Sequence, residues 1–238
     1  MTEGEWLTCT DSSRMLKFLG GRASDRKLRL FAVTCWRRSP SLLQTEEQRR
    51  AVEVAEQYAD GLASLPELAA ARTAALGVAC GSGWTAATRA ALEVNGRTRA
   101  AAAEATAGTA AWRVSLSGGR YVPIRESPHA RGPGQTAAAA AAWKKEYPCQ
   151  AAMLRDIFGL LPFRPVTIPA EVVAWSDRVV VRLAEGIYEE KAFGRMPILA
   201  DALLDAGCDD EELLSHAREQ GAVHTRGCWL LDLLLNKE

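Results

Sequence analysis

The stretch Ser24–Arg38, SDRKLRLFAVTCWRR, carries the pattern that decides the fold class. Counting from Leu28, its apolar residues recur at i, i+3, i+4, i+7 and i+8, which is the spacing of one buried face of an α-helix. Ser24 stands where an N-cap side chain accepts hydrogen bonds from free backbone N–H groups at a helix start. The stretch therefore predicts a capped amphipathic helix.

Similar helix signals lie on both sides of this stretch. Asp11 can cap a helix that ends at Gly20-Gly21, and two serine or threonine residues begin capping boxes, Thr45 with Gln48 and Ser64 with Glu67. Further helices are expected near the C-terminus: one with Pro148 in its first turn, then residues 169–188, a helix from Pro197 to Gly207, and one around Leu213. The apolar tail 228–235 fits a helix or a buried strand, and a helix is favoured because its neighbours are helical.

The sequence predicts a mainly α protein, a multi-helix globular bundle with one long Gly/Pro-rich loop. Three segments are expected within one folded unit. They are an N-terminal helical segment, residues 1–64; an alanine-rich variable helical region, residues 65–146, with an exposed loop at 116–134; and a C-terminal helical segment, residues 147–238.

Composition excludes several classes of protein. Lysine plus arginine and aspartate plus glutamate number 29 each, so no global field attracts nucleic acid or anionic lipid. We expect no secretory signal and no membrane span, because the start is acidic and no apolar stretch is long enough. The six cysteines are spread along a chain that needs no disulfides, which predicts reduced thiols in a cytoplasmic protein.

Several strings at the two ends of the chain are distinctive: WLxCxD from Trp6, ASDRKLRLFA from Ala23, LRDIFG from Leu154, PILADAL from Pro197 and RGCW from Arg226. They resemble a paralogous family of planctomycete (Gemmata-like) proteins of unknown function. The alanine-rich centre lies outside the resemblance. The resemblance implies one folded unit with a variable middle, and it implies no catalytic residue.

Cysteine and histidine gather near the C-terminus, where two of only three histidines lie between two cysteines. Such residues are typical ligands of tetrahedral zinc. One pair has the spacing of a usual ligand arm, with three intervening residues, and the other gaps are of seven residues. A helix-turn-helix would have to close these gaps; otherwise the cysteines are buried thiols and the histidines surface residues. The candidate zinc ligands are Cys208, His216, His224 and Cys228.

The predicted helix 24–38 also carries a group of basic residues with Trp36 among them. A basic helical face of this kind is typical of phosphate contacts to nucleic acid. The alternative is a solvated polar face whose last arginines complement the helix dipole. The candidate nucleic-acid-binding residues are Arg22, Arg26, Lys27, Arg29, Arg37 and Arg38.

No catalytic motif is recognisable. The chain has neither a nucleophile elbow nor a phosphate-binding loop, and His129 has no Ser or Cys partner at a familiar spacing. We therefore expect a non-catalytic helical protein–protein interaction module, an adaptor or an accessory subunit, with a protein partner. Two alternatives remain: a nucleic-acid-associated accessory protein of a larger nucleoprotein complex that uses helix 24–38, and a small structural zinc protein.

Overall fold

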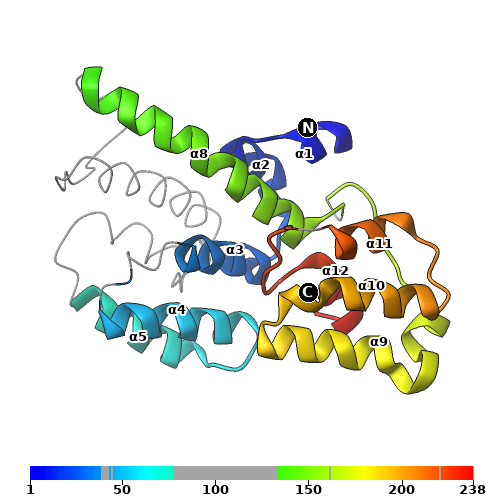
Figure 1. The fold of residues 1–238 in the computed structure, drawn as a ribbon. Coiled ribbons are helices and arrows are strands. Elements are labelled where there is room, and N and C mark those ends of the chain that lie inside the picture. The colour runs from blue at the N-terminus through cyan, green and yellow to red at the C-terminus, as the bar shows by residue number, and fades with distance from the viewer. Residues whose placement is uncertain (39–42, 44, 78–132, 161, 220, 238) are drawn as a thin grey trace. The chain divides into compact units, whose positions relative to one another are not determined.

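The computed structural model describes residues 1–38, 43, 45–77, 133–160, 162–219 and 221–237. Within these ranges the regular structure is helical, with ten α-helices and no strand, which confirms the predicted fold class (Figure 1). The predicted loop 116–134 lies outside the described residues except for its last two, which belong to a helix. The chain divides into two compact units, Glu3–Ala151 and Ala152–Glu238.

The first unit contains the N-terminal helices and most of the long helix α8. α3 packs on α4 and α4 packs on α5, and side chains such as Val33, Trp36 and Leu68 form a shared core. The helices are α1 (Glu3–Thr8), α2 (Ser12–Leu19), α3 (Asp25–Arg37), α4 (Glu46–Ala59), α5 (Leu65–Gly77) and α8 (Pro133–Phe158), with a 3-10 turn η1 (Gly20–Arg22).

The predicted caps of this unit are confirmed. Asp11 accepts from the backbone N–H groups of Ser13 and Arg14 at 3.0 and 3.1 Å, and Ser24 accepts from that of Lys27 at 3.3 Å. Both capping boxes form, Thr45 with Gln48 and Ser64 with Glu67. Each cap is a contact over two or three residues, so the local sequence is enough to specify it.

The start of α8 corrects one expectation. Pro148 lies inside this 26-residue helix rather than in its first turn. Six consecutive alanines at 137–142 precede it, and alanine is the strongest helix former. The helix instead begins at Pro133, because proline is favoured at the first helical position, where its missing N–H costs nothing.

A buried polar chain links α2, the end of α3 and α8 within the first unit. The Ser12 hydroxyl donates to Gln150 Oε1 at 2.9 Å, and Gln150 Nε2 donates to Glu146 Oε1 at 3.4 Å. Arg38 Nε lies 3.8 Å from the same Glu146 oxygen. Ser12, Glu146 and Gln150 are fully buried, so these contacts replace part of the hydration that the polar groups lose on folding.

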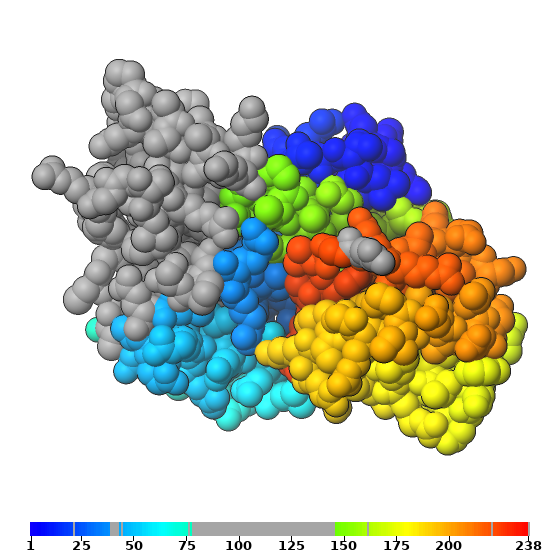
Figure 2. Space-filling model, viewed as in Figure 1, coloured from blue at the N-terminus to red at the C-terminus, as the bar shows by residue number. Residues whose placement is uncertain are grey.

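The second unit begins in the last turns of α8 and contains the remaining helices. They are α9 (Ala170–Glu190), η3 (Phe193–Arg195), α10 (Met196–Asp205), α11 (Glu211–Arg218) and α12 (Trp229–Leu235). α9 packs on α10 and α12, and α10 packs on α11. Their yellow, orange and red atoms are closely packed (Figure 2), around a core that includes Leu199, Leu213 and Leu231. No helix among the described residues has both the length and the apolar character needed to cross a membrane.

The helix expected over 169–188 is present as α9, but it is interrupted. Trp175 is extended, and Ser176, Asp177 and Arg178 have φ values of 45°, 57° and 60°. In an unbroken helix Asp177 would share the face of the buried residues Val180 and Ala184, at i+3 and i+7. The interruption instead leaves the Asp177 side chain 88% exposed, which avoids burying its charge.

Candidate metal centre

Asp156 brings a carboxylate into the core of the second unit. It lies in the last turn of α8, and its side chain is 4% exposed. Oδ2 accepts hydrogen bonds from the Thr225 backbone N–H at 2.9 Å and from the Thr225 hydroxyl at 3.2 Å. A buried carboxylate needs such partners because it has lost its water. The other oxygen, Oδ1, faces two histidines.

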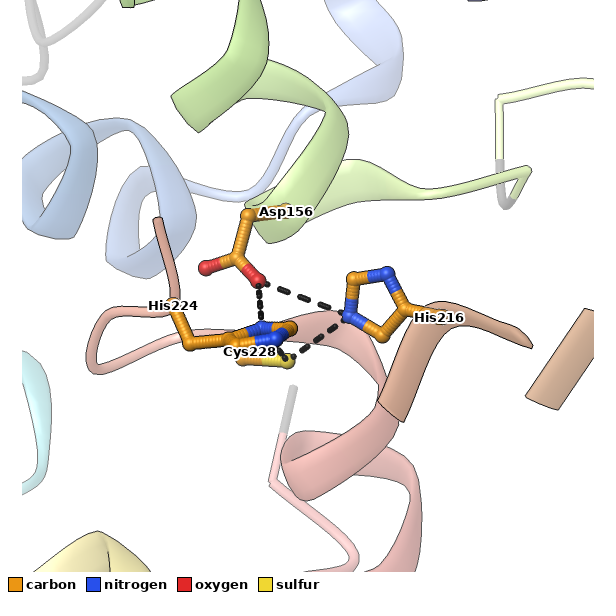
Figure 3. Close-up of side chains that lie close together, drawn as sticks. All are labelled: Asp156, His216, His224 and Cys228. Atoms are coloured by element: carbon orange, nitrogen blue, oxygen red, sulfur yellow. Dashed lines mark hydrogen bonds and ion pairs between the residues drawn. The ribbon is translucent and has the colours of Figure 1, made fainter. Parts of the chain in front are cut away.

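His216 lies in the last turn of α11, a helix that Asp210 caps through the backbone N–H groups of Glu212 and Leu213. Its Nε2 lies 3.5 Å from Asp156 Oδ1 and 3.2 Å from Cys228 Sγ. The side chain is 15% exposed. The cap and the helix therefore direct one nitrogen of His216 toward both the carboxylate and the thiol (Figure 3).

His224 and Cys228 lie in the segment that leads from α11 into α12. His224 Nδ1 lies 2.8 Å from Asp156 Oδ1 and 3.9 Å from Cys228 Sγ. Cys228 is the N-cap residue of α12, and its backbone N–H donates to the Thr225 carbonyl at 3.0 Å. That turn brings the two side chains, four residues apart, to the same point (Figure 3).

The four side chains converge on one position. Each offers one ligand atom, and these atoms all lie within 4.8 Å of one another. A tetrahedral zinc ion with Zn–N and Zn–O bonds of about 2.0–2.1 Å and a Zn–S bond of about 2.3 Å separates its ligand atoms by about 3.3–3.6 Å. The distances given above bracket these values, so small shifts of the side chains would complete a tetrahedron.

The same geometry argues against a catalytic Cys–His–Asp relay. In such a relay one imidazole directs one nitrogen at the nucleophile and the other nitrogen at the carboxylate. Here Nε2 of His216 faces both groups, and Nδ1 of His224 faces both groups. Nε2 of His224 is buried without a hydrogen-bond partner among the described residues. Ligand atoms that face one shared point are what a tetrahedral metal ion requires.

In the metal-free group the Cys228 thiol is held protonated, so a bound cation would have to displace its proton. Burial raises the pKa of the Cys228 thiol well above its usual value, and the charge of Asp156 raises it further. Burial also opposes ionisation of Asp156, but hydrogen bonds and charge from His216 and His224 outweigh it and hold the pKa of this carboxyl below its usual range. With a divalent cation bound, a thiolate, a carboxylate and two neutral imidazoles would sum to zero, so no net charge would be buried.

Trp229 forms an apolar wall beside the group. Its ring centroid lies 5.0 Å from that of His216, and the two histidine rings meet edge-on at 4.9 Å. Gly159, with φ +50°, allows this packing, because a Cβ built on it would lie only 2.6–2.7 Å from Trp229 ring carbons. The glycine at the end of α8 therefore makes room for the residue that follows Cys228.

The sequence predicted three members of this group, His216, His224 and Cys228, and the structure brings them together. It does not bring in Cys208, which is 3% exposed and packs in the core after α10, its backbone N–H donating to the Leu203 carbonyl. The fourth member is Asp156, which was not among the residues predicted from the sequence. The one indication of Asp156 in the sequence is that this acidic residue stands between Leu154 and Ile157, whose residue types usually lie in a core.

The predicted basic face has a different environment from the one expected. Within the first unit Arg26 pairs with Asp60 at 3.0 Å, Arg37 with Glu56 at 2.9 Å and Arg38 with Glu146 at 3.8 Å. Lys27 and Arg29 are buried. The guanidinium carbons of Arg22 and Arg29 lie over the rings of Phe18 and Tyr58, at 4.7 and 5.0 Å from the ring centroids. These contacts pair most of the charge within the unit, which differs from the alternative of a solvated face. Nucleic-acid binding by these residues stays a prediction.

We expect Arg26→Ala to reduce the free energy of unfolding by about 2 kcal/mol, because the buried Asp60 carboxylate loses a charged donor. The two side chains are only 13% and 1% exposed. Arg50→Ala is the matched control: Arg50 pairs with Glu53 at the surface, where the side chains are 60% and 52% exposed, so little change is expected. Urea unfolding measures the free energy of unfolding of both variants. Equal losses in the two variants would contradict a structural role for Arg26.

Comparison with known protein families, with curated proteins and with solved structures finds no match to this chain. The described residues define a mainly α protein, and the chemistry of the four-residue group is what indicates a function.

Proposed function

We propose that the protein is a non-catalytic helical module whose C-terminal unit is stabilised by one zinc ion. The ligands are Asp156 Oδ1, His216 Nε2, His224 Nδ1 and Cys228 Sγ. The observation that carries the proposal is the convergence of these four atoms, within 4.8 Å of one another, from three separate parts of the unit. Zinc suits this mixture of nitrogen, oxygen and sulfur donors in a four-coordinate site.

The ion would be structural rather than catalytic. Four protein ligands fill a tetrahedron, whereas catalytic zinc keeps a position open for water or substrate. The site is also sheltered, since the side chains of Asp156 and His224 are 4% and 5% exposed. Zinc would link the end of α8, the end of α11 and the start of α12. Such a link would stabilise α12, because a helix of seven residues is not stable by its helix propensity alone.

The module is proposed to bind a protein partner, as expected from a helical chain without catalytic motifs, and the partner and the cytoplasmic location stay predictions. The internal pairing of Arg26, Arg37 and Arg38 gives no support to the nucleic-acid alternative. The zinc alternative of the sequence analysis thus becomes part of the leading proposal, with Asp156 in place of Cys208.

Calorimetric titration of the metal-free full chain with zinc tests the proposal. We expect one zinc ion per chain and no comparable uptake of magnesium, because Mg²⁺ requires six oxygen ligands. Native mass spectrometry of the same samples counts the bound ions. Absence of a saturable site for zinc, or equal binding of magnesium, would contradict the proposed centre.

A further inference from the structure

The two oxygens of Asp156 have different surroundings. Oδ1 faces the proposed metal position, with His224 Nδ1 at 2.8 Å and His216 Nε2 at 3.5 Å. Oδ2 accepts from the backbone N–H of Thr225 at 2.9 Å and from its hydroxyl at 3.2 Å. A carboxylate whose second oxygen accepts from a backbone N–H, and from a hydroxyl when that hydroxyl points toward it, is hindered from turning that oxygen toward a metal.

Thr225 lies in the segment 224–228, which carries the proposed ligands His224 and Cys228. It follows His224 directly, it is 8% exposed, and its carbonyl accepts from the Cys228 backbone N–H at 3.0 Å. Its hydroxyl also lies 3.2 Å from the Arg226 carbonyl, and a hydroxyl has one proton to donate. The residue therefore connects Asp156 on α8 with the turn that carries the other two ligands.

We propose that Thr225 is a positioning residue that holds Asp156 as a one-oxygen ligand and so keeps the centre four-coordinate. This inference rests on the proposed zinc site. If Oδ2 were released, Asp156 could bind through both oxygens and raise the coordination number. Four-coordination favours zinc and cobalt over magnesium and calcium, which take six or more oxygen ligands. Thr225 thereby contributes to the choice of metal as well as to its affinity.

The test compares Thr225→Val with Thr225→Ser in the full chain. Valine keeps the shape and the backbone N–H but removes the hydroxyl, and serine restores the hydroxyl. With Co²⁺ as a spectroscopic probe, we expect strong visible bands typical of four-coordination for the native chain and for T225S, and weaker bands for T225V. Zinc affinity, measured by competition with a chelator, should fall about tenfold in T225V and stay near native in T225S.

Ser215→Ala is the matched control, since Ser215 adjoins His216 but its hydroxyl donates to the Glu212 carbonyl outside the group. It should change neither the spectrum nor the affinity. If T225V does not fold, T225A provides the same loss of the hydroxyl. An unchanged cobalt spectrum and zinc affinity in T225V or T225A would overturn the role of Thr225, as would an equal loss in T225S. Failure of the native chain to bind zinc would instead refute the zinc site itself.

Discussion

Replacing Cys228 with alanine should abolish the stabilisation of the protein by zinc. A ligand that binds only the folded state at a hundred times its dissociation constant adds about 2.7 kcal/mol to the free energy of unfolding, and about 4.1 kcal/mol at a thousand times. The native chain should show this gain in urea unfolding with and without zinc. C228A should show little of it, because the fully buried Cys228 side chain supplies the sulfur of the proposed ligand group.

Cys208→Ala is the matched control for this experiment. Cys208 is also buried, at 3% exposed, and belongs to the core of the same unit, but it lies outside the ligand group. C208A should therefore lose some stability through its smaller side chain and keep the full zinc-dependent gain. A native gain in C228A, or the loss of the gain in C208A, would show that the ligand set is wrong.

Gly159→Ala should strongly destabilise the second unit. A Cβ at this position would lie 2.6–2.7 Å from ring carbons of Trp229, and the backbone has φ +50°. Overpacking and left-handed strain together predict a loss of about 3 kcal/mol in the free energy of unfolding. Because Trp229 follows Cys228 and contacts His216 at 5.0 Å between ring centroids, zinc affinity should fall as well.

Gly186→Ala provides the comparison. Gly186 lies inside α9, and a Cβ there would meet nothing within 4 Å. Alanine is favoured over glycine within a helix, so G186A should gain about 0.5–1 kcal/mol. Urea unfolding and a chelator competition on both variants separate the two cases. A native midpoint of unfolding and native zinc affinity in G159A would show that the packing of Trp229 against α8 has been misjudged.

Much of the fold could be predicted because its signals are local. The caps at Asp11, Ser24 and Thr45 each depend on residues within three positions, and all three form. Two features could not be predicted in this way. The interruption of α9 depends on which face of the helix the core buries, and the start of α8 depends on the balance between an alanine run and Pro148. The first depends on tertiary packing and the second on two opposing helix preferences, so neither can be read from a local pattern alone.

The candidate site shows the same division. His216, His224 and Cys228 lie within thirteen residues, so their density in the sequence indicated a metal site. Asp156 lies 68 residues before His224, and only the packing of α8 against the C-terminal segment of its own unit brings it in. Cys208 has the right chemistry, but the turn after α10 directs it into the hydrophobic core. Residue type pointed to three members of the group, and tertiary packing placed Asp156 rather than Cys208 beside them.

X-ray absorption at the zinc edge of the zinc-loaded full chain would identify the ligand atoms. We expect a first shell of four atoms, one sulfur at about 2.3 Å and three nitrogen or oxygen atoms at about 2.0–2.1 Å. A first shell without sulfur, or a six-coordinate shell of light atoms, would contradict the centre formed by Asp156, His216, His224 and Cys228.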